Sequence, residues 1–481
     1  MYICICHCCC CLFCHFIAFL VLVWVRSGNP IPFSAFLSSL AYPLWFLLGR
    51  LCLSRLPSPL VVGAARKMLD EVQLREFYEF VYPVELVTQW LSYKFAPVKK
   101  TDDAIDTDSS LAPLLSEDIA KKESRNIAAE GYLARREFCF TLLGDIFTRF
   151  RSYSSTAELR RDLIRCYPEK IDVGAVYTIR PNQKQSASSI LPLERELVFD
   201  IDMSDYDSVR SCCSGKSICN YCWTWMACAA HVLRRILQED FGFRYILPVF
   251  SGRRGIHLWV CDKRACKMHD DERSALVGYL TVVVPKASRQ AVVADFVNGK
   301  PIHPTIRSVQ SDIIDPAFTR LFLESSESNP NSVLHPRGAS VVYSAIVAAL
   351  KMGSRRDVEQ RFLQHVPFED GNILDWGYMV RALGDAAENV TAAAQLLVMY
   401  PRLDEHVTTR RDHLLKLPFC VHPGTASLCC PLEWDTLVSF DPLTDAPKLQ
   451  EMLLNRHMDL KWLQPLKSML QEMSLDPEEE R

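Results

Sequence analysis

The sequence predicts a mixed α/β fold for most of the chain, and three observations support this prediction. Four β-rich runs are interpreted as strands, at residues 173–179, 197–203, 245–250 and 256–261. A helix is expected from Trp223 to Asp240, and residues 313–400 are expected to be mainly helical, with a loop near Ser325–Pro336. With 481 residues, 49% of them hydrophobic, the chain is long enough for two or three domains with a sizeable core.

The first 67 residues differ in composition from everything that follows. They contain five basic and no acidic residues, and eight of the 20 cysteines of the chain. The segment from Cys8 to Val25 is apolar enough to span a bilayer, which would suit a signal anchor. No positive charge precedes it, however, and four consecutive cysteines are unusual in an anchor. We therefore expect residues 1–67 to be a gene-model artefact, with translation beginning at Met68, and we do not expect membrane association.

The body that begins at Met68 opens with apolar residues at helical spacing over residues 69–95, with a break at Pro83. Residues 96–127 are polar and rich in charge, and we expect them to be an exposed, disordered insertion. The chain ends, over residues 446–481, in a helical segment and an acidic tail.

The charge of the body is acidic, with 49 basic and 57 acidic residues and a net charge of -8. Attraction to phosphate must therefore come from local basic pairs, such as Arg253–Arg254, Lys263–Arg264 and Arg410–Arg411, or from a partner chain. The cysteines of the body lack the regular spacing of a secreted disulfide scaffold, so a reducing intracellular compartment is expected.

Two aspartates lie on the predicted strand Leu197–Met203. Because side chains alternate between the two faces of a strand, Asp200 and Asp202 share one face. Two carboxylates so close repel each other unless a cation lies between them, and oxygen ligands favour magnesium or manganese. Two such ions can activate a 3′ hydroxyl and stabilise a leaving pyrophosphate. An Asp-x-Asp pair also marks strand ends without function, and it occurs in metal-dependent glycosyltransferases.

A basic turn connects the last two predicted strands, with the sequence Ser251-Gly-Arg-Arg-Gly255. Its glycines allow the backbone to bend sharply over five residues. Arginine binds two phosphate oxygens with one planar group, and a histidine adds a donor. An exposed hairpin tip would explain the same arginines equally well. The candidates for phosphate contact are Ser251, Arg253, Arg254 and His257.

Four cysteines lie within eleven residues, at Cys212, Cys213, Cys219 and Cys222. Four thiolates fit a structural, tetrahedral zinc site. Buried free thiols or a redox pair are the alternatives, and we favour zinc because a reducing compartment leaves such a cluster few other uses.

A third carboxylate, Asp404, lies where a helical region is expected to give way to a strand. It would serve as a further metal ligand, and Lys416 and His422 would meet phosphates. Each of these residues alone is more simply explained as structural, and they gain weight only together with the acidic strand and the basic turn.

Taken in order, these segments resemble the small catalytic subunit of eukaryotic and archaeal DNA primases. The similarity covers roughly residues 70–95 and 130–445. It is specific in the joint occurrence of the acidic strand, the cysteine spacing and the basic turn, although no single segment is. The segments that carry it, besides the four cysteines, are Arg136–Leu142, Asp172–Tyr177, Arg180–Gln183, Glu196–Asp207, Glu239–Phe243, Ser251–His257, Pro401–Asp404 and Leu414–Pro423.

The resemblance implies a primase α/β fold with a mixed catalytic sheet, an inserted zinc motif and a helical subdomain. The expected parts are the first part of the core over 68–310, the helical subdomain over 311–400, the closing part of the core over 401–445, and the segment 446–481. It places metal ligands (magnesium or manganese) at Asp200, Asp202 and Asp404, an active-site carboxylate at Glu137, and zinc at Cys212, Cys213, Cys219 and Cys222. Nucleotide contacts fall on Ser251, Arg253, Arg254, His257, His413, Lys416 and His422.

The resemblance also implies an activity and partners. The enzyme would make short RNA primers from ribonucleoside triphosphates on single-stranded DNA, in the nucleus, with the DNA primase large subunit and the DNA polymerase alpha complex. Two alternatives stay open from the residues alone. A membrane-anchored glycosyltransferase would explain the N-terminus and the triplet Asn389-Val-Thr391, but neither the cysteines nor the basic turn. A zinc-bearing nucleic-acid-binding module without catalysis gives no reason for the acidic strand face.

Overall fold

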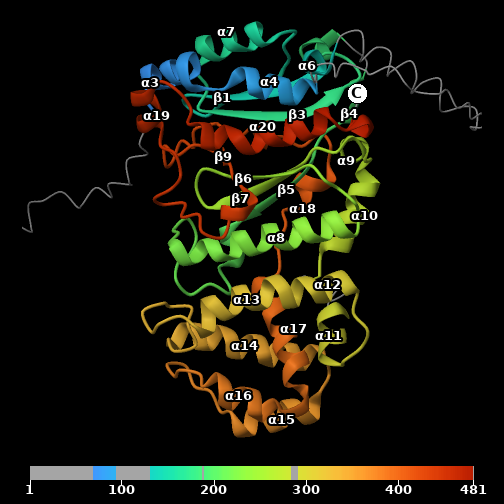
Figure 1. Cartoon of the computed structure of the whole chain (residues 1–481), viewed down its shortest axis with the longest axis vertical. Coiled ribbons are helices and arrows are strands. Elements are labelled where there is room, and N and C mark those ends of the chain that lie inside the picture. Colours follow the sequence, from blue (N-terminus) through green and yellow to red (C-terminus); the bar gives the residue numbers. More distant parts are fainter. Residues whose placement is uncertain (1–68, 94–130, 187–188, 283–290, 480–481) are drawn as a thin grey trace, which may run out of the picture. The chain divides into compact units, whose positions relative to one another are not determined.

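The structure is a computed structural model that describes residues 69–93, 131–186, 189–282 and 291–479 (Figure 1). All of these residues belong to one compact unit, Lys67–Arg481. The expected artefact at 1–67 and the expected insertion at 96–127 lie outside the described residues, and the domain boundaries stay predictions. Within the described ranges, no helix is both long and apolar enough to cross a membrane.

The first sheet has the strand order β2-β1-β3-β4, and β8 pairs with β3 as well. Figure 1 shows the first helices of the described chain over this sheet. The predicted break near Pro83 is confirmed, because a π-helical turn ends at Val81 and the next helix begins at Val84. The elements are β1 (Arg136–Leu142), β2 (Ile146–Arg151), β3 (Lys170–Tyr177), β4 (Pro192–Glu194), β8 (Leu415–Lys416), α3 (Glu71–Glu76), α4 (Val84–Ser92), α6 (Tyr132–Arg135) and α7 (Thr156–Cys166).

The second sheet has the order β5-β7-β6-β9 and carries the acidic strand. Helix α8 lies against β5 and β7, and helix α20 lies against β6 and β9 (Figure 1). All side chains of β6 and β7 are buried, which places this hairpin in the centre of the core. The elements are β5 (Leu197–Asp202), β6 (Ile246–Phe250), β7 (Gly255–Val260), β9 (Cys430–Pro431), α8 (Trp223–Glu239) and α20 (Leu460–Ser474).

The implied mixed sheet is corrected by the strand pairings. Every pairing between described strands is antiparallel. Strands β5 and β6 run in the same direction and are connected through α8, an arrangement that usually places two parallel strands side by side. Here β7 returns through a tight turn and lies between them, so each of the two has an antiparallel neighbour.

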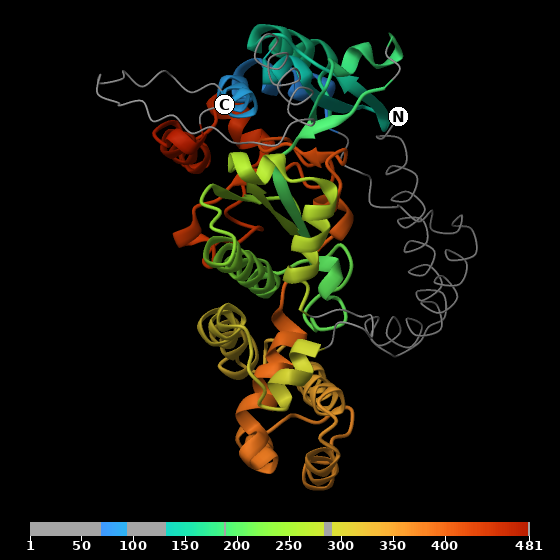
Figure 2. The ribbon, with the colours of Figure 1, turned by 90° about the vertical axis from the view of Figure 1, so that its right-hand side faces the viewer.

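A helical region follows the second sheet, as expected for residues 313–400, and its loop falls between residues 324 and 335. Figure 2 shows its helices packed on one another. Helix α14 begins with Pro336 at its first position, where a missing N–H costs nothing. The region comprises α11 (Ala291–Val297), α12 (Pro304–Val309), α13 (Asp315–Phe318), α14 (Pro336–Met352), α15 (Arg356–His365), α16 (Trp376–Leu383) and α17 (Ala387–Met399). The remaining α-helices of the described residues are α9 (Lys263–Lys267), α10 (Asp270–Leu280), α18 (Glu405–Thr409) and α19 (Leu449–Asn455).

Candidate active site and cysteine cluster

The two aspartates of the acidic strand lie at the end of β5, beside β7. Asp200 pairs with His257 and Asp202 pairs with Gly255 in antiparallel register. Phe199 and Ile201 point to the other face and are fully buried, whereas both aspartates are partly accessible. The alternation of the strand therefore places the two carboxylates on one face, as its pattern predicted.

The turn between β6 and β7 depends on its two glycines. Gly252 has a φ of +88°, and a Cβ atom at this position would lie 2.9 Å from Cβ of His422. A Cβ atom on Gly255 would lie 2.6 Å from the carbonyl oxygen of Ile201. The Gly255 amide donates to Oγ of Ser251 at 2.9 Å, so this hydroxyl also fixes the turn. Gly255 is already the first residue of β7, so the connection has one residue fewer than the five predicted.

The closing segment of the chain attaches to this sheet and its turn through hydrogen bonds to backbone carbonyl oxygens. The Asp404 amide donates to the carbonyl oxygen of Asp200 at 3.2 Å. The prediction of a strand at Asp404 is wrong, because its carboxylate accepts from the His406 amide and caps the N-terminus of α18. Farther along, Nζ of Lys416 donates to the carbonyl oxygen of Ser251 at 2.9 Å and ties β8 to the basic turn.

One pocket of about 380 Å³ collects side chains from these three distant segments. The ten residues predicted for metal and nucleotide contact that line it are Asp200, Asp202, Asp404, Ser251, Arg253, Arg254, His257, His413, Lys416 and His422. The pocket also contains Lys170, Asp172 and Lys216, which the sequence did not single out as site residues. Asp172 lay within one of the segments that carry the family resemblance, whereas the two lysines gave no signal.

Burial and the neighbouring carboxylates raise the proton affinity of Asp200. Burial, followed by the charges of Asp202 and Asp404, raises the pKa of Asp200 to about 7. Nε2 of His257 lies 3.5 Å from Oδ1 of Asp200, but burial lowers the pKa of this histidine to about 3, so it brings no charge. A crowded group of carboxylate oxygens is the environment that a divalent cation stabilises, so these residues fit magnesium or manganese.

Asp202 differs from its neighbours because it already has a cationic partner. Nε of Arg254 donates to both of its carboxylate oxygens, at 2.7 and 2.9 Å. Although partial burial opposes ionisation, hydrogen bonds from Arg254 and Ser204 lower the pKa of Asp202. Among the described residues, the side chains already gathered as a possible metal group are the four cysteines, so the three aspartates are not pre-assembled around one ion.

Glu137 lies on β1, outside the lining of the pocket. It is fully buried and accepts hydrogen bonds from Nε of Arg149 at 2.9 Å and from the Tyr177 hydroxyl at 3.0 Å. Arg149 lines a neighbouring pocket, which shares Lys170, Asp172, His413 and Leu414 with the first. The geometry therefore connects Glu137 to the site through Arg149 rather than by direct contact.

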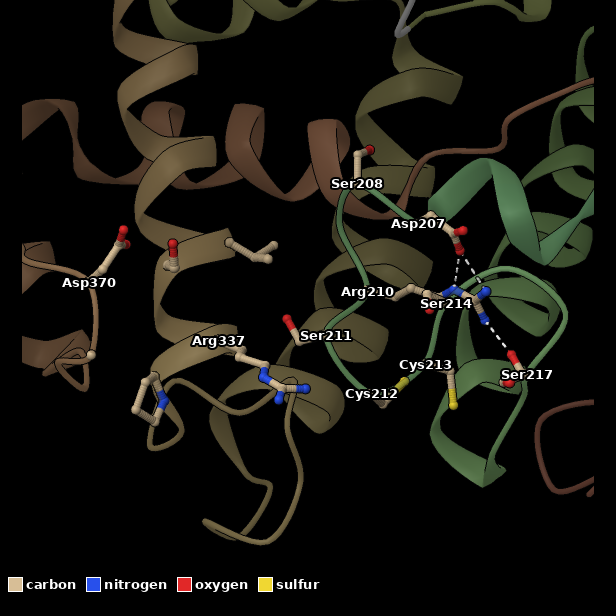
Figure 3. A pocket seen from close by; sticks show the side chains of 14 residues that line it. Asp207, Ser208, Arg210, Ser211, Cys212, Cys213, Ser214, Ser217, Arg337 and Asp370 are labelled. Atoms are coloured by element: carbon tan, nitrogen blue, oxygen red, sulfur yellow. Dashed lines mark hydrogen bonds and ion pairs between the residues drawn. The ribbon is translucent and has the colours of Figure 1, made fainter. Parts of the chain in front are cut away.

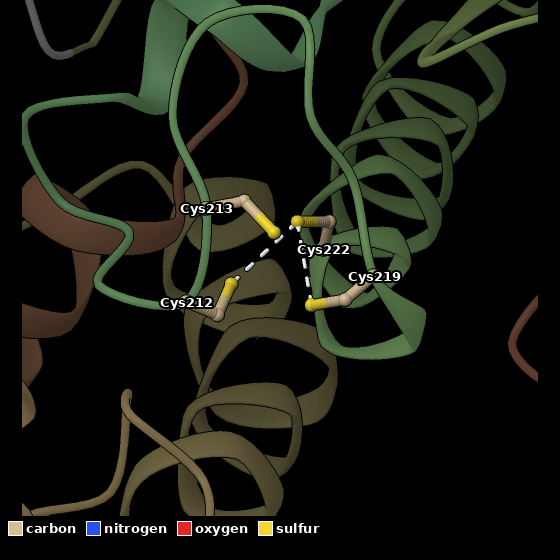
Figure 4. A group of neighbouring side chains, drawn as sticks. All are labelled: Cys212, Cys213, Cys219 and Cys222. Carbon is tan, nitrogen blue, oxygen red and sulfur yellow. Dashed lines mark hydrogen bonds between the residues drawn. The ribbon is translucent and has the colours of Figure 1, made fainter. Parts of the chain in front are cut away.

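The four predicted cysteines converge on one point, as Figure 4 shows. Their sulfur atoms all lie within 4.8 Å of one another, with 3.5 Å between Cys212 and Cys222 and 3.8 Å between Cys219 and Cys222. Four sulfurs placed about 2.3 Å from one zinc ion at tetrahedral corners would lie about 3.8 Å apart. All four are free thiols, so the cluster can hold a metal ion.

A buried arginine braces the loop that carries these cysteines. Arg210 donates to the carboxylate of Asp207 at 2.7 Å, to two backbone carbonyls of the loop, and to Sγ of Cys222 at 3.4 Å. The loop faces the beginning of α14 across a pocket of about 770 Å³ (Figure 3). Because a positive charge stabilises neighbouring thiolates, Arg210 favours the deprotonated form that binds metal.

Comparisons with known proteins match the core and most of the chain. The family model described as DNA primase small subunit matches residues 199–434. The DNA primase small subunit of Schizosaccharomyces pombe is 33% identical over 404 residues, covering 81% of this chain and 79% of its own. This chain belongs to the DNA primase small subunit family. The DNA primase small subunit of Drosophila melanogaster is 35% identical, and the match covers 67% of this chain and 75% of the fly protein. That of Saccharomyces cerevisiae is 31% identical, and the match covers 69% of this chain and 81% of the yeast protein.

Membership in the DNA primase small subunit family confirms the resemblance drawn from the motifs, and the chain is a primase, an enzyme of the nucleotidyltransferase class. Asp200 and Asp202, the basic turn, and the pocket residues from Asp404 to His422 all lie within residues 199–434, the range that the family model matches. The glycosyltransferase and the non-catalytic zinc module gain no support from these comparisons.

Proposed function

We propose that this primase joins ribonucleoside triphosphates into short RNA primers on a single-stranded DNA template, and that the pocket at the end of β5 is its catalytic site. The observation that carries the proposal is the convergence of ten predicted residues, from three segments far apart in the sequence, on one pocket. Acidic groups for a cation and basic groups for phosphate meet there, which is the combination that phosphoryl transfer requires.

Asp200, Asp202 and Asp404 are the residues that would hold magnesium or manganese. When bound, such ions activate the attacking 3′ hydroxyl and stabilise the pyrophosphate that leaves. The chain itself supplies the oxygen ligands on a rigid edge, because β5 is paired with β7 over its whole length. The hydrogen bond from the Asp404 amide to the carbonyl oxygen of Asp200 keeps the third carboxylate near the other two.

The basic residues of the pocket would orient the triphosphate. Arg253 and Arg254 lie on the turn whose backbone is held by Lys416 through Ser251. Burial, then Lys416 and Arg253, lower the pKa of His422 to about 3, so at neutral pH it is uncharged and can donate from one ring nitrogen. Ser251, His257 and His413 complete the set proposed to contact nucleotide.

The cysteine cluster is proposed to hold one structural zinc ion per chain. It lies in the loop that connects the acidic strand β5 to helix α8. Closing that loop around a metal would hold the start of α8 in place, so the ion would act on stability rather than on chemistry.

The proposed partners are the primase large subunit and, through it, the DNA polymerase alpha complex, and the proposed location is the nucleus. The acidic body of the chain supports this, because a net charge of -8 leaves only local basic groups for the template. We expect weak, strongly salt-dependent binding of single-stranded DNA by this chain alone and a marked gain when the large subunit is added. Binding isotherms at two salt concentrations, with and without that subunit, decide this, and equal affinities would contradict it.

The function is tested by ribonucleotide incorporation on an unprimed single-stranded DNA template, with magnesium or manganese. We expect short RNA products from the full chain and none from the Asp200→Asn variant with an unchanged melting temperature. Products of equal yield from the two proteins would contradict the assignment of the site, and no product from a folded wild-type chain supplied with the large subunit would contradict the function.

A further inference from the structure

The carboxylate of Asp202 accepts hydrogen bonds from Ser204 and Arg254. Its Oδ1 atom accepts from the amide and the hydroxyl of Ser204, each at 2.7 Å, and from Nε of Arg254 at 2.7 Å. Its Oδ2 atom accepts from the same Nε at 2.9 Å. A cation that uses both oxygens would therefore have to replace the guanidinium.

The neighbouring charged groups lack such a contact. Within the described part of the chain, Arg253 forms no ion pair or hydrogen bond, although it lies beside Arg254 on the same turn. Among the described residues, Asp200 forms no ion pair with an arginine or lysine, and Nε2 of the uncharged His257 lies 3.5 Å from its Oδ1 atom. Asp404 caps α18 instead of pairing with a cation. One arginine and one carboxylate of the pocket are thus selectively paired.

The contact uses one edge of the guanidinium and leaves the other side unused. Both bonds to Asp202 come from Nε, and neither terminal nitrogen of Arg254 has a hydrogen-bond partner among the described residues. The pair is also accessible, with 21% of the arginine side chain and 38% of the aspartate side chain exposed. Arginine that is held loosely at a surface can turn towards a stronger anion, and a triphosphate is such an anion.

We propose that Arg254 is an internal counter-cation that competes with the divalent ion for Asp202, and that a bound triphosphate removes this competition by drawing the guanidinium away. The inference rests on the proposed function, in which Asp202 is a metal ligand. Its consequence is that metal and nucleotide bind cooperatively. The ion takes Asp202 and the triphosphate takes Arg254, so either ligand breaks the pair and frees the partner that the other ligand needs. By linkage the coupling is reciprocal, so it can be measured from either side.

The metal side is measured as Mn²⁺ affinity of the full chain without nucleotide, by electron paramagnetic resonance of the free ion. We expect Arg254→Ala to bind Mn²⁺ about 10-fold more tightly than wild type. Arg253→Ala is the matched control, because it removes the same charge from the same turn but breaks no contact with Asp202, and a smaller gain is expected. Arg254→Lys keeps the charge and loses Nε, so it should also bind more tightly than wild type.

The nucleotide side is measured as the affinity for a fluorescent ribonucleoside triphosphate in the presence of a chelator. We expect Asp202→Asn, which frees Arg254, to bind nucleotide more tightly than Asp404→Asn, which removes an equal charge but no contact with the arginine. This arm keeps the inference testable if an arginine variant fails to fold.

Equal Mn²⁺ gains in Arg254→Ala and Arg253→Ala would overturn the inference, since they would show a general charge effect. Equal nucleotide gains in Asp202→Asn and Asp404→Asn would overturn it as well. Failure of the proposed function has a different signature: Mn²⁺ binding that is unchanged by Asp200→Asn in every background would show that the ion binds elsewhere, whatever the arginine variants do.

Discussion

The cysteine cluster and the carboxylate pocket are two candidate metal sites built in opposite ways. The cluster takes its four ligands from eleven consecutive residues, and its sulfur atoms already lie at the spacing of one tetrahedral ion. The pocket takes its carboxylates from residues 200 to 404, and one of them is held by an arginine while another caps a helix. A closed site suits an ion that stays, and an open one suits ions that arrive and leave with substrate.

The largest effect is expected from the open site. Asp200→Asn or Asp202→Asn should lower the rate of primer synthesis about 1,000-fold, because each removes a charged ligand from the proposed two-metal site. Folding should persist, since neither carboxylate is part of the hydrophobic core. Primer yield per minute and a thermal melt measure the two quantities separately.

Asp205→Asn is the control for these variants. Asp205 lies on the same segment but does not line the pocket, so its variant should keep most of the activity. Wild-type rates in Asp200→Asn or Asp202→Asn would show that these residues bind no catalytic ion.

A substitution in the cysteine cluster should change the stability of the protein rather than its rate of primer synthesis. Cys219→Ser should lose zinc and lower the free energy of unfolding by at least about 3 kcal/mol, because metal binding free energy is folding free energy in such sites. Metal analysis and thermal unfolding of the purified protein measure this. Cys166→Ser, a half-buried thiol outside the cluster, should leave the zinc content unchanged. A wild-type protein without zinc would remove the basis of this comparison.

Chelation should separate the two sites in one protein. Brief treatment with a chelator should abolish primer synthesis, and added magnesium or manganese should restore it, because the carboxylates are reached through an open pocket. The zinc content should stay constant during this treatment, since four thiolates hold the ion more tightly. Loss of zinc in step with loss of activity would mean that the sites are not independent.

The smallest effect is expected at Glu137, which reaches the site only through Arg149. Glu137→Gln keeps the shape of the side chain and weakens the two bonds that it accepts from the guanidinium, so we expect a loss of activity of about 10-fold. Steady-state kinetics measure it, with Asp202→Asn for comparison. A loss as large as that of Asp202→Asn would place Glu137 among the catalytic groups themselves.

Much of the fold followed from local sequence patterns. The four predicted strands correspond to β3, β5, β6 and β7, and the helix expected at Trp223–Asp240 is α8. Strands β8 and β9 have two residues each, which is too short for any alternation to be visible. The antiparallel pairing of all described strands was also not predictable, because local sequence patterns do not show that β7 lies between β5 and β6.

The candidate site was predictable where its residues share a short segment. The strand pattern placed Asp200 and Asp202 on one face, and the spacing of the cysteines indicated their cluster. The pairing of Arg254 with Asp202 was not predictable, because it depends on the register between β5 and β7. Lys170 and Lys216 were missed because a lone lysine has the same appearance in sequence whether it faces solvent or substrate.

The position of β8 and β9 has a consequence for how the chain is made. These strands, at residues 415–416 and 430–431, pair with β3 of the first sheet and β6 of the second. A ribosome synthesises the chain from its N-terminus, so β8 and β9 are among the last strands to be made. Until then both sheets are incomplete, and the pocket lacks Asp404 and Lys416. Contacts of such long sequence separation close slowly. A chain truncated before residue 404 should therefore leave sheet edges exposed and be a substrate for chaperones rather than a smaller enzyme.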